Sequence, residues 1–197
     1  HEFKSVVLTP RAQELMTALD ERVVIADGAM GTMLQDRKPS LEDFLGHEGC
    51  NEILNVTRPD IVLDVHNAYF ETGIDCVETN TFGANWSNLS DYGIDDRIEE
   101  LARAGAELAR QSADSFTAKD GKPRWVLGSM GPGTKLPSLG HTTYQHLKDT
   151  FALQAKGLIL GGADAFMVET SQDLLQTKAA VNACRQAVVD TGIRLPI

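Results

Sequence analysis

Cysteine is scarce in this chain, which has three cysteines, Cys50, Cys76 and Cys184, among 197 residues. The number is odd and the three lie far apart, so they do not form a disulfide framework, and we expect a reducing, cytoplasmic environment. No C-x-x-C or adjacent pair is present, so the spacing predicts no zinc site within these residues. We interpret Cys76 and Cys184 as small buried hydrophobic residues, whereas Cys50 lies in a loop where it could be exposed.

Basic residues are also few, with 18 Lys and Arg against 28 Asp and Glu, a formal net charge of −10. An acidic chain without a basic cluster is a poor candidate for binding nucleic acid or an anionic membrane. No apolar run approaches the length of a membrane span. The start, His1-Glu2-Phe3, lacks the basic and apolar regions of a signal peptide. We interpret residues 1–10 as a cloning remnant followed by an N-terminal arm.

Short apolar runs alternate with helical periodicity along the chain. Residues 73–79 are echoed by residues 162–170: Gly ends a helical pattern, an Asp and an apolar run follow, and Glu-Thr closes the segment. Gly takes the left-handed helix-stop conformation at little steric cost, and such apolar runs are typical of strands buried in parallel sheets. Two more apolar runs fit the same place in the pattern: 23–26, which ends in Asp27-Gly28, and 125–127, which ends in Gly128-Ser129. The repeat predicts an α/β fold of about four strand–helix units.

Helix signals separate these strands. A helix over 59–70 is expected to begin with Pro59 in its first turn and Thr57 as its N-cap. Thr142 and Gln145 have capping-box spacing ahead of a later helix. Residues 117–122 are the most loop-like interior stretch, and residues 195–197 look like the start of another strand.

A strand–helix repeat builds either a doubly wound open sheet or a (β/α)8 barrel of the TIM type. Residues 27–32 lack the G-x-G-x-x-G spacing of the dinucleotide-binding fold, and the Gly-Lys-Ser/Thr triplet of a P-loop is absent. Polar residues follow every predicted strand, and in a barrel these strand ends converge on one face. A whole barrel needs about 250 residues. We therefore expect residues 11–197 to form the N-terminal half of a (β/α)8 barrel.

Candidate site residues follow the predicted strands: Asp27, Thr79, Asn80, Ser129 and Glu169. Two carboxylates at one mouth can act as a general acid–base pair, or they can hold a primary ammonium through charge-assisted hydrogen bonds. They can equally do no more than cap loops.

The glycine-rich turn at 28–31 leaves backbone N–H groups free, which suit a carboxylate or phosphate oxygen. An ammonium clamp beside such an anion cradle describes a site for a zwitterionic amino acid. A second glycine-rich stretch, 128–133, is explained more simply as a tight turn. The histidines show no metal-pair spacing, and we expect structural or surface roles for His47, His66, His141 and His146.

Six blocks of sequence resemble, in the same order, the homocysteine S-methyltransferase family, and its cobalamin-dependent members most of all. The blocks are IADGAMGT at 25–32, CNEILN at 50–55, ETNTFGAN at 78–85, GSMGPG at 128–133, GGAD at 161–164 and VET at 168–170. They cover nearly the whole chain after the first ten residues, and together they are specific.

The resemblance implies a barrel in which a zinc-bound homocysteine thiolate takes the methyl group of methylcobalamin to form methionine. Zinc would lower the pKa of the thiol and supply a nucleophile at neutral pH. The resemblance places six residues around homocysteine: Asp27 and Glu169 at its ammonium, backbone groups of Gly28 and Ala29 at its carboxylate, and Thr79 and Ser129 at the mouth.

The family's zinc ligands are three cysteines on later strands, and none of the three cysteines here matches those positions. The resemblance implies that the chain stops before the zinc ligands and without the cobalamin- and folate-binding modules of the same polypeptide. We expect this piece to be inactive alone. We also expect it to self-associate through the open half-barrel, where its last strand and the apolar surfaces facing the missing half are unpaired, or to be disordered near its C-terminus. Two other functions stay open: a barrel lyase or isomerase with Asp27 and Glu169 as its acid–base pair, and a non-catalytic half-barrel module.

Overall fold

The structure, a computed structural model, describes residues 2–197. His1, which belongs to the expected cloning remnant, lies outside this range. The strands are β1 (Cys76–Glu78), β2 (Trp125–Met130) and β3 (Ala165–Val168). The α-helices are α1 (Pro10–Glu21), α2 (Gly31–Asp36), α3 (Leu54–Thr57), α4 (Pro59–Glu71), α5 (Trp86–Asp91), α6 (Ile98–Asp120), α7 (Tyr144–Gly161) and α8 (Leu174–Thr191). Short 3-10 turns are η1 (Glu2–Ser5), η2 (Glu42–Phe44), η3 (Asn51–Ile53), η4 (Asp95–Arg97) and η5 (Pro137–Leu139).

The three strands form a parallel sheet in the order β1-β2-β3. The strand predicted at 23–26 is reduced to a single bridge beside β1, with Val23 and Ile25 exposed. Ala26 pairs parallel with Cys76, and the Asp27 N–H donates to the Cys76 carbonyl at 3.1 Å. At the opposite edge the Phe166 N–H donates to the Pro196 carbonyl at 2.9 Å. The sheet therefore runs in chain order from the first predicted strand to the last residues.

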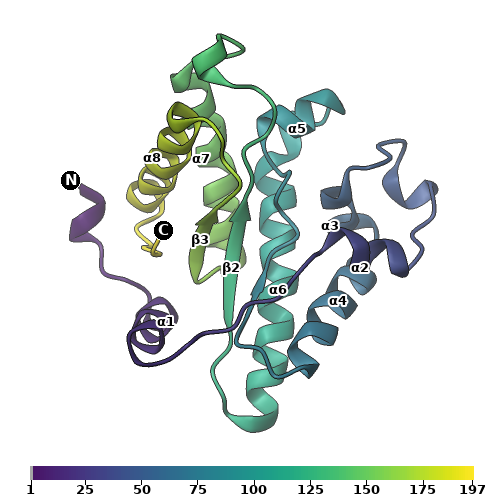
Figure 1. Ribbon diagram of the computed structural model, residues 1–197, viewed down its shortest axis with the longest axis vertical. Helices are drawn as coiled ribbons and strands as arrows, with labels where there is room; N and C mark the ends of the chain where they lie inside the picture. Colours follow the sequence, from purple (N-terminus) through teal and green to yellow (C-terminus); the bar gives the residue numbers. More distant parts are fainter. Residues whose placement is uncertain (1) are drawn as a thin grey trace.

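Three long helices pack in series along one side of the strands, as Figure 1 shows for α6, α7 and α8. The main hydrophobic core lies between these helices and the sheet and includes Val77, Val126 and Phe166. α7 approaches α6 closely because it presents glycine: a Cβ on Gly161 would come within 2.5 Å of the Arg103 carbonyl oxygen. Close helix packing of this kind fixes the helical layer behind the sheet.

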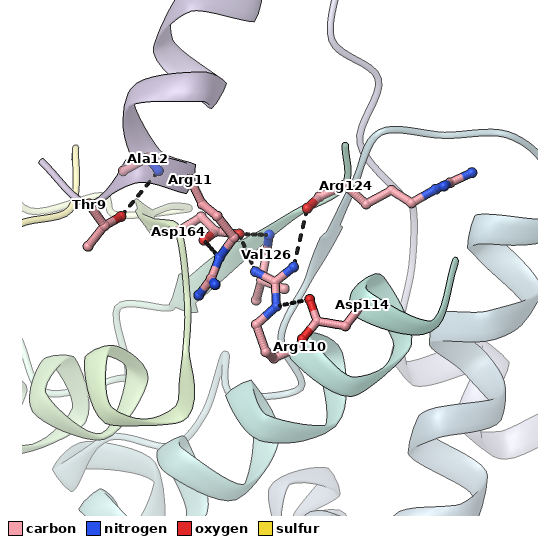
Figure 2. Close-up of polar contacts among 8 residues, drawn as sticks. All are labelled: Thr9, Arg11, Ala12, Arg110, Asp114, Arg124, Val126 and Asp164. Atoms are coloured by element: carbon pink, nitrogen blue, oxygen red, sulfur yellow. Dashed lines mark hydrogen bonds and ion pairs between the residues drawn. The ribbon is translucent and has the colours of Figure 1, made fainter. Parts of the chain in front are cut away.

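α1 lies against the sheet face opposite to that layer. Its Leu15 packs with Cys76, Trp125, Leu127 and Ala165. The first turn of the helix is tied to the base of the sheet through the fully buried carboxylate of Asp164, as the dashed lines in Figure 2 show.

That carboxylate accepts hydrogen bonds from Arg11 of α1 at 2.8 Å, from Arg110 of α6 at 2.6 Å and from the Val126 N–H at 2.8 Å. A buried carboxylate requires such partners because an unpaired charge is costly to desolvate. Asp164 therefore joins α1 and α6 to β2 at one point.

The predicted helices are present, but their predicted N-cap residues are not the ones that the structure shows. The helix over 59–70 is α4, but Arg58 is its N-cap residue and Thr57 belongs to α3, so that cap prediction was wrong. Thr143, rather than Thr142, caps α7 and accepts from the His146 N–H at 3.1 Å.

The predicted loop at 117–122 was also wrong in part. α6 continues to Asp120, because Phe116 keeps its apolar face against the core, and the helix ends at Gly121 in the left-handed conformation with φ 73°. No helix of the described residues is long and apolar enough to cross a membrane.

Candidate functional site

A pocket of about 270 Å³ opens at the carboxyl ends of the strands. It is lined by all six residues predicted to surround a substrate: Asp27, Gly28, Ala29, Thr79, Ser129 and Glu169. Asp27, Gly28 and Ala29 follow the bridge at Ala26, whereas Thr79, Ser129 and Glu169 lie at the ends of β1, β2 and β3. They meet because parallel strands present their carboxyl ends at one edge. The structure thus brings together side chains up to 142 positions apart, from Asp27 to Glu169.

Asp27 lines this pocket and is held in place by the neighbouring strand β1. Its Oδ1 accepts a hydrogen bond of 3.1 Å from the Glu78 N–H. Burial raises the pKa of Asp27 to about 7, and the nearby charges of Glu78 and Glu169 act in the same direction. Asp27 is therefore poised to change charge near neutral pH.

Ser129 and Glu169 form a pair at the ends of β2 and β3. The Ser129 hydroxyl donates a hydrogen bond of 2.5 Å to Oε1 of Glu169. This bond fixes the carboxylate, and its second oxygen accepts no hydrogen bond from another described residue. Glu169 thus presents a fixed acceptor to the pocket.

Thr79 lines the same pocket, but its hydroxyl is already used between the strands. Its Oγ1 accepts from the Ser129 N–H at 3.0 Å and lies 2.6 Å from Oγ1 of Thr81. Since the Thr81 hydroxyl donates to the Ser129 carbonyl, Thr79 is the donor to Thr81. Thr79 therefore shapes the mouth of the pocket and has no hydroxyl proton left for a ligand.

Two carboxylates at the pocket were missed in the sequence, Glu78 and Glu52. Burial raises the pKa of Glu78, and the charge of Glu169 adds to the effect. Burial also raises the pKa of Glu52, whose Oε1 accepts from the Gly83 N–H at 2.8 Å. The echo of 73–79 in 162–170 could have identified Glu78, because it aligns Glu78 with Glu169.

The lining is strongly acidic. It contains four carboxyl groups, and among the described residues no Lys, Arg or His lines it. A concave site lined by one sign of charge attracts the opposite sign. The pocket therefore favours a ligand that carries a cationic group.

The cysteines do not provide a metal site. All three cysteines are buried. Cys50, which the sequence placed in a loop where it could be exposed, is therefore not exposed. Burial raises the pKa of both Cys50 and Cys76 to about 12, which keeps these thiols protonated, whereas zinc binds thiolates. Within residues 2–197 no group of three His, Cys, Asp or Glu side chains is arranged to hold a metal ion. These residues therefore do not supply the set of thiolate ligands that zinc would need.

Comparison with known proteins identifies the chain's relatives. The family described as homocysteine S-methyltransferase matches residues 24–197. The methionine synthases of Mycobacterium leprae and Mycobacterium tuberculosis are each 55% identical over 184 residues, which is 93% of this chain and 15% of theirs. The chain thus spans about 15% of the length of these relatives.

Solved structures show the same fold. The metallated form of the homocysteine methyltransferase MmuM from Escherichia coli matches with a TM-score of 0.73 at 23% identity, over 92% of this chain and 64% of that one. Its oxidized form matches with a TM-score of 0.72, also at 23% identity, over 92% of this chain and 63% of that one.

Proposed function

Since the chain belongs to the homocysteine S-methyltransferase family, we propose that it forms the homocysteine-binding part of a methionine synthase. In that reaction a methyl group passes from methylcobalamin to the thiolate of homocysteine. One observation carries the proposal: Asp27 and Glu169 share a pocket with the exposed backbone of Gly28 and Ala29. This arrangement suits both charged groups of an amino acid.

The ammonium of homocysteine would lie between Asp27 and Glu169. Each has one oxygen engaged by the protein, through the Glu78 N–H and the Ser129 hydroxyl respectively, and one that is available as an acceptor. Hydrogen bonds between an ammonium and a carboxylate are among the stronger ones in proteins. The carboxylate of the substrate would meet the backbone of Gly28 and Ala29, which lines the same pocket.

We propose that the sheet is part of a (β/α)8 barrel that begins after an N-terminal arm of about ten residues. Consecutive parallel strands lie side by side in chain order, and the long helices cover one side of them. A doubly wound sheet would reverse its strand order at some point, whereas here every neighbour follows in chain order. The fold shared with MmuM supports this arrangement.

Zinc and methylcobalamin enter this proposal through the longer relatives. Zinc would lower the pKa of the homocysteine thiol and so favour its thiolate, but the buried cysteines described above are not its ligands. The cobalamin- and folate-binding modules would be further parts of the same polypeptide. This chain's own contribution is to bind and orient the amino acid.

Calorimetric titration tests the function directly. Homocysteine is expected to bind more tightly than 3-aminopropane-1-thiol, which lacks the carboxylate, and 4-sulfanylbutanoate, which lacks the amine. Each missing charged group should cost at least about tenfold in affinity, because hydrogen bonds to charged groups contribute about 1.5–3 kcal/mol. Failure to bind homocysteine, or equal affinity for all three compounds, would contradict the proposal.

A further inference from the structure

We propose that Tyr69 is a positioning residue, which turns backbone N–H groups of the loop after Asp27 into the pocket to receive the carboxylate of the substrate. The inference rests on the proposed function. It adds to the site a side chain from α4 that does not line the pocket.

The ring of Tyr69 is held firmly. It is half-buried and packs against two hydrophobic clusters. One is the main core between the long helices and the sheet, and the other surrounds α4. From this position its hydroxyl donates a hydrogen bond of 2.6 Å to the carbonyl of Ala29, forty residues earlier. The same hydroxyl oxygen would lie only 3.3 Å from a Cβ placed on Gly28. Tyr69 therefore supports the backbone of this loop at close range.

The geometry of the peptide bond converts that contact into an orientation for the next residue. In a planar trans peptide, the carbonyl and the following N–H point in opposite directions. Because the Ala29 carbonyl points to Tyr69, outside the pocket lining, the Met30 N–H is turned the other way. Met30 and Gly31 both line the pocket.

The N–H groups in this stretch are available. Those of Ala29, Met30 and Gly31 donate to no other described residue. Successive free N–H groups form a concavity that suits an anion. Four carboxyl groups line the same pocket, so an anion held here must carry a compensating positive charge, as an amino acid does.

The variant Tyr69→Phe tests this role because it removes the hydroxyl and keeps the ring in its packing. Its affinity for homocysteine should fall about five- to tenfold, the value of one hydrogen bond that contributes about 1 kcal/mol. Its affinity for 3-aminopropane-1-thiol should stay unchanged, because that ligand has no carboxylate. Tyr144→Phe is the matched control, since Tyr144 accepts a hydrogen bond of 2.6 Å from Asn182 and does not line the pocket.

A selective loss for homocysteine supports the role of Tyr69. An equal loss for both ligands, or no loss, overturns it and leaves the proposed function standing, whereas failure of the unaltered chain to bind homocysteine overturns the proposed function. A measurement without ligand keeps the two separate. In NMR spectra Tyr69→Phe should shift the Ala29 carbonyl carbon and the Met30 amide, and Tyr144→Phe should not; unchanged shifts in Tyr69→Phe also overturn the role.

Discussion

Oγ of Ser129 lies 2.5 Å from Oε1 of Glu169 and joins the end of β2 to the residue that follows β3. A serine hydroxyl has a single proton to donate, and this contact commits it to the carboxylate. Glu169 is thereby held in one orientation before any ligand arrives. Preorganised acceptors of this kind lose little entropy on binding.

The first prediction concerns the two acids of the ammonium clamp. Glu169→Gln and Asp27→Asn should each lower homocysteine affinity by about ten- to a hundredfold, since each replaces a charged acceptor worth about 1.5–3 kcal/mol. Calorimetry measures the loss, and Asp96→Asn, at an exposed position in η4, serves as the control. Unchanged binding in both clamp variants would remove the assignment.

The second prediction concerns the pH dependence of stability at Asp27. Its pKa is about 7 in the folded protein, above the ordinary value of 3.8, mainly because of burial. The folded state therefore binds this proton more tightly than the unfolded state, and Asp27 makes the protein less stable as pH rises from about 4 to 7. Asp27→Asn should gain stability relative to the unaltered chain over that range, measured by urea denaturation. A constant difference from pH 4 to 8 would show that the Asp27 carboxyl titrates normally.

The third prediction concerns His66, which is fully buried in α4 with no hydrogen-bond partner at either ring nitrogen among the described residues. Burial lowers its pKa to about 4 from an ordinary 6.5. The unfolded chain takes up this proton first, so stability should fall as pH drops from about 6.5 to 4. His66→Leu should flatten that slope in urea denaturation, whereas His47→Leu, on a half-buried ring, should keep it. Equal slopes in all three proteins would contradict the prediction.

The fourth prediction is that this chain binds zinc weakly or not at all. Its thiols are buried and their pKa values are raised, so forming thiolates there is costly. Metal analysis after equilibration with zinc and desalting should find well under one equivalent. One equivalent of zinc that disappears in Cys50→Ser would show that a site exists.

The fifth prediction is self-association through the sheet face against which α1 lies. A groove of about 460 Å³ there is lined almost entirely by apolar side chains, and Leu19 of α1 is 52% exposed at its rim. Contiguous exposed apolar surface promotes association. Sedimentation should detect dimers or larger species that Leu19→Glu reduces, whereas Leu153→Glu, on α7 outside the groove, should not. A sharp monomer at high concentration would refute this.

The sequence by itself determined the strand–helix order and the residues at the strand ends. Apolar runs closed by Asp27, Ser129 or Glu169 depend only on local spacing, and parallel strands bring such ends together whatever the details of packing. Six separated blocks of sequence also sufficed for the family, which the match over residues 24–197 shows. Local signals were least reliable at helix ends, as the shift of the cap from Thr142 to Thr143 illustrates.

Only the tertiary structure decided which distant groups meet. Three features depend on elements far apart in the chain: the contact between Tyr69 and Ala29, the burial of Cys50, and the place of Glu78 in the pocket. The same holds for the Asp164 carboxylate, whose partners Arg11 and Arg110 lie 153 and 54 residues away. Residue spacing reports the period of a helix or strand, whereas these contacts depend on how the elements pack. The contact of Tyr69 with the loop after Asp27 is one that packing alone decides.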